Sequence, residues 1–292
     1  MRIRLDWFGE KLLQRLVDIE AGRLTPPTPR DAATVMLLRP AGADGADGAD
    51  GGGVEVLMLR RVAAMKFAPG AYVFPGGSVD PADSDPEVGW HGPDPAEFGR
   101  RLGAAAEMAR ALVCAAVRET FEESGVLLAG TPGGGPLAVP AGSSWESDRK
   151  ALIAGEVTLA QLLSRRGLVL RADLLVPWTR WITPEGEPRR FDARFFAAAL
   201  PAGQLATGHA AESDHTAWLR PADAIAAARV GEISLLPPTA TTLNDFAVAA
   251  AAGHGVAEIL GRPPLIEPIM PLLAVEDGAA WLHIPDEVGY PL

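Results

Sequence analysis

The sequence predicts an α+β fold with a mixed sheet, and three observations lead to that prediction. Short runs rich in aliphatic residues, typical of strands, lie at 33–38 and 54–59. Longer patterns with helical spacing lie at 103–124 and 238–252. The two kinds of segment do not alternate regularly, so the chain does not match a series of βαβ repeats.

Apolar residues at helical spacing in residues 3–20 predict an amphipathic N-terminal helix. Its apolar stripe consists of Leu5, Phe8, Leu12, Leu16 and Ile19. The stripe fits a dimer contact, a lid, or packing on the helix's own domain. A proline-rich stretch at 26–29 follows. We therefore expect residues 1–28 to form a helical extension and residues 29–292 to form the main domain.

The next elements form the predicted sheet and its principal helix. The runs at 33–38 and 54–59 predict paired strands, joined by a loop of A-D-G triplets whose spacing does not match a calcium loop. A third strand at 71–74 runs into P-G-G. Residues 78–103 are rich in proline and aspartate and predict an irregular insertion before the helix at 103–124.

The second half of the chain predicts further elements after a glycine- and proline-rich stretch at 130–143. In order they are a helix at 158–166, strands near 168–175, at 191–199 and at 216–219, helices from Pro221 and at 238–252, and edge strands within 265–284. We expect the last of these to form a C-terminal helical and strand extension of the main domain.

The charge balance argues against two large classes of protein. The net charge is −11, whereas proteins that bind nucleic acid or membrane surfaces usually carry basic patches. An anionic substrate remains compatible with this charge, because a bound metal ion inverts the local field. Neither a secretory signal nor an apolar run near the ~20 residues of a membrane helix is evident. The expectation is a cytoplasmic enzyme.

The motif R-E-T-F-E-E-S-G-V at 118–126 carries most of the chemical information. Glu119, Glu122 and Glu123 are spaced at i, i+3 and i+4, which places three carboxylates on one face of a helix. Such crowded like charges favour a hard divalent cation with oxygen ligands. Gly125 suits the left-handed end of that helix. A solvated acidic face is the alternative interpretation.

The opposite face of the same helix is predicted to enter the core. Val113, Val117 and Phe121 recur at i, i+4 and i+8 and point away from the glutamates. Cys114 lies beside them and is the sole cysteine, which excludes an internal disulfide and a multi-thiolate zinc site. We expect a buried small residue there rather than a nucleophile. The motifs of serine hydrolases, phosphate-binding loops and zinc proteases do not occur.

Together with F-P-G-G at 74–77, the acidic motif resembles the second half of the Nudix box. Members of that family use magnesium or manganese to hydrolyse a nucleoside diphosphate linked to another group. The resemblance implies an α/β/α sandwich, the Nudix fold, around a mixed sheet. A typical box has a glutamate eight residues before the arginine, but Arg110 stands there, and the nearby Glu107 is out of register.

A second resemblance covers residues 57–77, which are similar to the extra motif of coenzyme A diphosphatases. Arg61, Lys66 and Gly70 stand at its charged and glycine positions, although Lys66 replaces an arginine, and Leu59 and Val62 replace hydroxyl residues. Further stretches are similar to the peroxisomal branch of these enzymes and its bacterial relatives. They are P-R-D-A-A-T at 29–34, the insertion within the box, F-D-A-R-F-F at 191–196 and L-P-P-T at 236–239.

The Nudix resemblance implies a set of metal ligands for Mg²⁺ or Mn²⁺. Glu122 and Glu123 are expected to be ligands, with the Gly77 carbonyl as a further one. Glu119 is either another ligand or the group that takes a proton from water. An acid further along the chain completes the expected set. Glu212 and Asp214 are the candidates, and Glu212 is the first choice.

The same resemblance implies residues that act beside the metal. Arg118 is expected to orient the glutamates, with a surface ion pair as the alternative interpretation. Arg61 and Lys66 are expected to bind substrate phosphates, because arginine binds phosphate in a bidentate manner and lysine acts as a point charge. Phe74 and Gly76, in the loop before the helix, complete the expected substrate-binding set.

The sequence thus predicts a metal-dependent diphosphatase, with coenzyme A or acyl-coenzyme A as the first choice of substrate. NADH, ADP-ribose, nucleotide sugars and nucleoside triphosphates are alternatives within the family. A catalytically silent Nudix-type nucleotide-binding module is the alternative from another class. We expect a small-molecule partner, with neither nucleic acid nor membrane, and a homodimer is left open.

Overall fold

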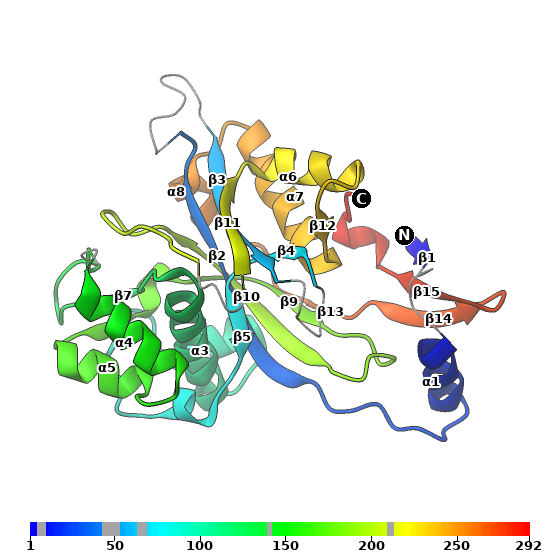
Figure 1. Ribbon diagram of the computed structural model, residues 1–292, viewed down its shortest axis with the longest axis horizontal. Coiled ribbons are helices and arrows are strands. Elements are labelled where there is room, and N and C mark those ends of the chain that lie inside the picture. The colour runs from blue at the N-terminus through cyan, green and yellow to red at the C-terminus, as the bar shows by residue number, and fades with distance from the viewer. Residues whose placement is uncertain (5–9, 43–52, 63–68, 139–141, 209–212) are drawn as a thin grey trace.

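The computed structural model is layered around a central sheet (Figure 1). The structure describes residues 1–4, 10–42, 53–62, 69–138, 142–208 and 213–292. Over these residues the central sheet has nine strands. They are β2 (Arg30–Pro40), β3 (Val54–Arg61), β4 (Ala71–Val73), β5 (Gly76–Ser78), β9 (Val176–Ile182), β10 (Phe191–Ala199), β11 (Ser213–Leu219), β12 (Ser234–Leu235) and β13 (Pro268–Ile269).

Strand directions make this a mixed sheet. Its path runs β12–β4–β3–β2–β10–β9–β13, with β11 paired to β3 and β5 paired to β2. β10 lies parallel to β2, whereas β3 lies antiparallel to it. The predicted strand pair and the third strand that leads into P-G-G are confirmed.

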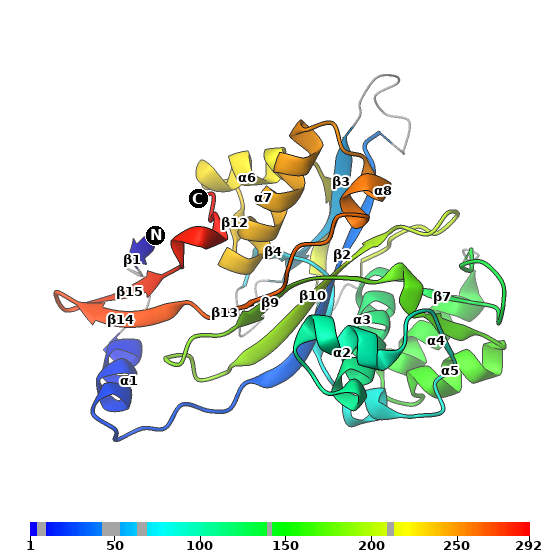
Figure 2. The same cartoon turned by 180° about the vertical axis from the view of Figure 1, so that it is seen from behind.

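Helices cover both faces of the sheet, as Figures 1 and 2 show. One face carries α2 (Pro95–Leu102), α3 (Ala106–Ser124), α4 (Ser143–Ile153) and α5 (Leu159–Arg166), and the other α6 (Pro221–Arg229), α7 (Pro237–Ala251) and α8 (Val256–Leu260). Val35 and Leu37 of β2 pack in the core with α3. Met36 and Leu38 pack in the opposite core with α7. Successive side chains of β2 therefore pack in the cores on opposite faces of the sheet, and the fold is the expected α/β/α sandwich.

Two small sheets flank the sandwich. One consists of β6 (Trp90–His91), β7 (Ala129–Gly130) and β8 (Val169–Arg171), and the other of β1 (Arg2–Arg4), β14 (Leu272–Glu276) and β15 (Ala279–His283). The helix α1 (Glu10–Glu20) packs on the second sheet through Leu12 and Leu16, which contact the cluster around Leu273. The predicted N-terminal helix is therefore correct from Glu10. The division at residue 28 stays a prediction.

Several elements differ from the sequence prediction, among them the central strand β9, which was not predicted. Residues 2–4 form a strand rather than the start of a helix, because Arg2–Arg4 pair with Trp281–His283 of β15. Leu5 and Phe8 lie outside the described residues. The insertion at 78–103 is not wholly irregular, since it holds a 3₁₀ turn at Pro81–Ser84 and the helix α2. The helix α4 was not predicted at all.

The remaining short elements are 3₁₀ turns. They lie at Ala172–Leu174, between β8 and β9, and at Asp286–Val288. The predicted strand near 168–175 is thus a short strand followed by a turn. Among the described residues, none of the helices combines the length and the apolar character that crossing a membrane requires.

Candidate active site

The helix α3 has one apolar side and one acidic end, as its spacing predicts. Val113, Val117 and Phe121 are at most 1% exposed and lie in the core. Gly125 ends the helix with φ of 72°, and its N–H donates to the Phe121 carbonyl at 2.9 Å. Cys114 is fully buried, and burial raises the pKa of its thiol to about 12. The thiol therefore stays protonated, as expected of a packing residue.

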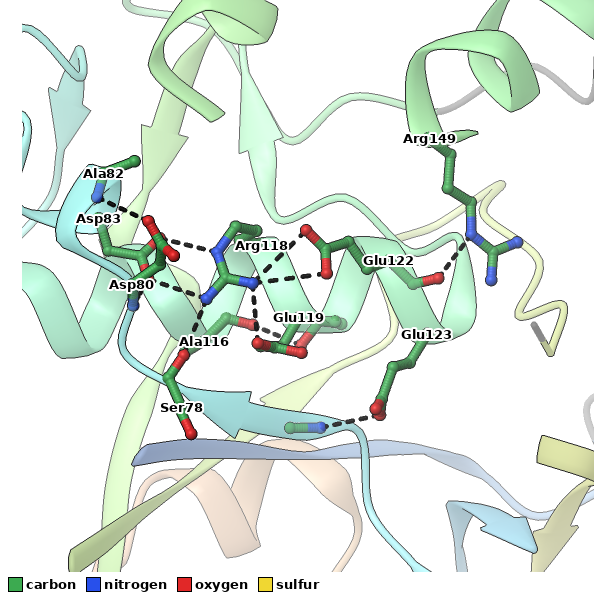
Figure 3. A network of polar contacts seen from close by, with 12 residues as sticks. Ser78, Asp80, Ala82, Asp83, Ala116, Arg118, Glu119, Glu122, Glu123 and Arg149 are labelled. Atoms are coloured by element: carbon green, nitrogen blue, oxygen red, sulfur yellow. Dashed lines mark hydrogen bonds and ion pairs between the residues drawn. The ribbon is translucent and has the colours of Figure 1, made fainter. Parts of the chain in front are cut away.

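The acidic end of α3 lies against β5, the strand that begins with the two glycines of P-G-G (Figure 3). The Gly76 N–H donates to Oε2 of Glu123 at 2.9 Å. A Cβ atom built on Gly77 would lie 2.4 Å from Oε1 of Glu119. The carboxylate therefore occupies the space that any other residue at position 77 would fill. The two halves of the predicted motif meet here in space.

Arg118 connects the glutamates to the same strand. Its Nη1 donates to Oε1 of Glu119 at 2.7 Å and lies 3.4 Å from both carboxylate oxygens of Glu122. Its Nη2 donates to the Ser78 carbonyl at 3.0 Å. Burial lowers the pKa of Arg118, but the hydrogen bond to Asp83 and the charges of Glu119, Asp83 and Glu122 raise it overall. The guanidinium therefore remains charged and lies where it can orient two glutamates.

Asp83 is the site residue that sequence reasoning missed. Its carboxylate accepts from both Nε and Nη2 of Arg118 at 2.9 Å, and the side chain is 1% exposed. The Asp80 N–H donates to Asp83 at 2.8 Å, which fixes the carboxylate within a capping box. Asp83 lies six residues after Gly77, before the rest of the insertion. The insertion separates it from Arg118 by 35 residues, so the helical spacing of the motif does not indicate it.

Arg110, which stands where a glutamate was expected, binds main-chain carbonyls of the insertion. Its Nη2 donates to the carbonyls of Pro86 and Val88 at 3.0 and 2.5 Å, and its guanidinium lies 5.1 Å from the Trp90 ring centre. Glu107 is exposed in the first turn of α3. Arg110 thus fastens the insertion to α3, and Asp83 supplies the acid that partners Arg118.

The charge and chemistry of these residues fit a hard divalent cation. Four carboxylates, those of Asp83, Glu119, Glu122 and Glu123, stand against the two guanidinium groups of Arg118 and Arg149, which leaves two negative charges in excess. Carboxylate and carbonyl oxygens are the donors that Mg²⁺ and Mn²⁺ favour. Over the described residues, no group of three acidic, histidine or cysteine side chains already stands in a metal-holding arrangement. The ligand assignments therefore stay predictions.

Comparison with known proteins identifies the family. The chain matches the family description "NUDT19 Nudix domain" over residues 93–245, more than half of its length. The chain belongs to this Nudix family. The matched region begins within the insertion and contains all of α3 and the segment around Thr207.

Individual Nudix relatives agree with the family match. The chain is 31% identical to "Acyl-coenzyme A diphosphatase NUDT19" of Gallus gallus over 254 residues and to the Homo sapiens protein of that name over 249 residues, 72% of this chain in each case. It spans 65% of the length of each of these two relatives. A crystal structure of a Nudix hydrolase from Alicyclobacillus acidocaldarius is 29% identical with a TM-score of 0.65, covering 82% of this chain and 98% of that one.

Arg61 and Phe74 are the remaining predicted site residues that the structure of this Nudix chain describes. Arg61 ends β3 and lines a cavity of about 800 Å³ together with Tyr72 and Asp214. Asp214, the second choice of downstream acid, accepts from Nε of Arg60 at 2.6 Å, and this hydrogen bond lowers the pKa of its carboxyl group. Phe74 is 3% exposed and packs in the core on the α7 side of the sheet. Its side chain therefore anchors the loop that leads to Gly76. Lys66 and Glu212 lie outside the described residues.

Proposed function

We propose that this protein is a metal-dependent diphosphatase that hydrolyses coenzyme A or acyl-coenzyme A. The observation that carries the proposal is the convergence of the α3 glutamates on β5, where Glu119 fills the space beside Gly77 and Glu123 accepts from the Gly76 N–H. The substrate class rests on the names of the chicken and human relatives. Hydrolysis would convert coenzyme A into an adenosine bisphosphate and a phosphopantetheine.

The residues of this chain would divide the work as follows. Glu119, Glu122 and Glu123, with the Gly77 carbonyl, would hold Mg²⁺ or Mn²⁺. The bound cation would neutralise phosphate oxygens and lower the pKa of a water molecule. Arg118, fixed by Asp83, would orient Glu119 and Glu122 during the reaction. Glu119 would serve either as a ligand or as the acceptor of the water's proton.

The cavity beside Arg61 is our proposed site for the part of the substrate remote from the scissile bond. The strand β4 borders it at Tyr72 and leads through Phe74 directly to Gly76. Among the described residues, Arg60 and Arg61 are the cationic residues of its lining. A volume of about 800 Å³ lies within the range of roughly 300–1,000 Å³ that small-molecule sites occupy.

We also propose a setting for this activity. The net charge of −11 supports a small-molecule substrate without nucleic acid or membrane surface as partner, and a cytoplasmic location is the accompanying prediction. The domain organisation follows the sequence: a helical extension at 1–28 and a Nudix domain at 29–292, with an insertion at 78–103.

A substrate panel tests the function directly. Coenzyme A, acyl-coenzyme A, NADH, ADP-ribose, nucleotide sugars and nucleoside triphosphates are incubated with Mg²⁺ or Mn²⁺, with and without a chelator, and products are identified by mass. We expect coenzyme A or its acyl ester to be cleaved fastest and the chelator to abolish cleavage. Faster turnover of another compound would replace coenzyme A as the proposed substrate. If no compound is turned over, a catalytically silent nucleotide-binding module is favoured.

A Glu123→Gln variant is the control for this panel. Glutamine keeps an oxygen that accepts from the Gly76 N–H, so the fold should persist while the charge is lost. Loss of several kcal/mol of charge stabilisation corresponds to a fall in kcat of about three orders of magnitude. Wild-type turnover by a folded Glu123→Gln protein would refute the assignment of Glu123 as a ligand.

A further inference from the structure

Arg149, in the unpredicted helix α4, contacts the end of α3 that carries two of the glutamates. The last turn of a helix leaves its carbonyl groups without partners inside the helix. Nε of Arg149 donates to the Glu122 carbonyl in this turn at 2.9 Å. Figure 3 shows Arg149 on the side of the glutamates away from Arg118. The two arginines thus approach the acidic turn from its two ends.

The same guanidinium also holds a second segment of chain. Its Nη1 and Nη2 donate to Oγ1 and the carbonyl of Thr207 at 3.2 and 3.0 Å. The Thr207 N–H in turn donates to the Ser124 carbonyl at 2.7 Å. Arg149, Thr207 and the last turn of α3 therefore form a closed ring of hydrogen bonds. The ring ties the helix end to the chain that precedes β11.

Neighbouring contacts hold the Thr207 segment in place. Gln204, which is 3% exposed, accepts from the Leu127 N–H at 2.8 Å and donates to the carbonyls of Leu127 and Leu137 at 2.9 and 2.7 Å. The segment is thus anchored beyond the turn, and Arg149 joins two parts of the chain that are each fixed elsewhere.

Burial and charge make Arg149 suited to this position. Its side chain is 4% exposed, and burial lowers the pKa of its guanidinium, while the charges of Glu146, Glu123 and Glu122 oppose that shift. A positive charge is favourable at a helix C-terminus. A guanidinium reaches all three acceptor atoms at once, because its donors lie in one rigid plane. A lysine would offer a single point of attachment.

We propose that Arg149 is a positioning residue that sets the place of Glu122 and Glu123 by fixing the last turn of α3. It acts through the main chain of Glu122 and through Thr207, and does not itself contact the metal or the substrate. This inference rests on the proposed function, because it concerns the ligands of the proposed cation. Partners that orient metal ligands typically change metal affinity by 10–100-fold when they are lost.

The test measures Mn²⁺ binding without substrate, by the electron paramagnetic resonance signal of free Mn²⁺, beside kcat and KM. For Arg149→Met we expect the Mn²⁺ dissociation constant to rise about tenfold and kcat to fall to a similar extent, with KM little changed. Arg149→Lys should lie between this variant and the wild type. Thr207→Val removes one of the three acceptors of Arg149, the Oγ1 atom, and should raise the Mn²⁺ dissociation constant by less than Arg149→Met does. This variant tests the proposal if Arg149→Met does not fold.

Arg171→Met is the matched control. Arg171 is also buried and also holds a carbonyl, that of Gly134 at 2.6 Å, but its side-chain partners Gly134 and Asp173 belong neither to α3 nor to the Thr207 segment. This variant should lose stability without a change in Mn²⁺ affinity. Equal Mn²⁺ affinity in wild type and folded Arg149→Met would overturn the positioning role. Tighter Mn²⁺ binding by Arg149→Met would also overturn it, because the loss of repulsion between the guanidinium and Mn²⁺ would then explain the result.

The two proposals fail in different ways. A wild-type protein that neither binds Mn²⁺ nor cleaves any compound would overturn the proposed function and this inference with it. A wild type that binds Mn²⁺ and turns over, with Glu123→Gln inactive and Arg149→Met unchanged, would overturn only the role of Arg149.

Discussion

The acidic end of α3 and the cavity beside Arg61 use charge in opposite ways. At α3, Arg118 and Asp83 form a bidentate pair whose side chains are only 12% and 1% exposed. At the cavity, the Arg60–Asp214 pair has side chains 44% and 45% exposed. Buried pairs hold one geometry, because an unpaired buried charge is costly, whereas exposed pairs are screened by water. The first region suits chemistry at fixed positions, and the second suits recognition of a charged ligand.

The first prediction tests whether the fixed geometry of α3 is needed for catalysis. In Gly77→Ala, the added Cβ would lie 2.4 Å from Oε1 of Glu119, so that carboxylate must move. We expect kcat to fall by about a hundredfold while the unfolding midpoint stays close to that of the wild type. Steady-state kinetics and urea unfolding measure the two effects separately.

Two further glycines sharpen this prediction. A Cβ on Gly76 would lie 2.5 Å from the Ala33 carbonyl oxygen, so Gly76→Ala should disturb the sheet and lower stability. Gly135 has open space around its Cβ position, and Gly135→Ala should change neither property. If Gly77→Ala behaved like Gly135→Ala, the contact between Glu119 and residue 77 would not matter for the reaction.

Much of the fold was predictable because its elements carry strong local patterns. The central strands are nearly continuous apolar runs, and α3 combines an apolar stripe with a glycine stop at Gly125. The strand β1 was missed because three residues, Arg2–Arg4, carry no periodicity, and their partner β15 lies at the other end of the chain. The helix α4 was missed because S-S-W-E-S-D-R-K has no regular apolar face.

The site was predictable where its residues are close in sequence and hidden where they are not. The glutamates and Arg118 share one helix, so their spacing alone indicates a common face. Asp83 contacts Arg118, which lies 35 residues further along the chain. Arg149 contacts Glu122, which lies 27 residues before it, in the same part of α3. A lone aspartate in a loop and a lone arginine in a polar stretch carry no pattern. Only the fold shows that both fasten the acidic turn.

The second prediction weakens the buried pair at α3. Asp83→Asn keeps the shape of the side chain but removes the charge that partners Arg118. Loss of one member of a buried pair typically costs 3–5 kcal/mol, and because Arg118 keeps Glu119 and Ser78 we expect about 2 kcal/mol in the free energy of unfolding. Asp94→Asn is the control, since asparagine caps α2 as well as aspartate does. Equal stability of the two variants would show that the buried pair of Asp83 and Arg118 does not stabilise the acidic end of α3.

The third prediction concerns the open region and has the smallest expected effect. Arg61→Ala should raise KM for coenzyme A about tenfold and leave kcat near the wild-type value, because it removes a charge-assisted contact that binds substrate and transition state alike. Arg61→Lys should restore part of the affinity, since lysine keeps the charge but not the bidentate geometry. Asp214→Asn breaks the neighbouring exposed pair and should shift KM by no more than about twofold. A fall in kcat for Arg61→Ala with unchanged KM would instead place Arg61 among the residues that act on the scissile bond, and the division between a fixed catalytic end and an open binding end would no longer hold.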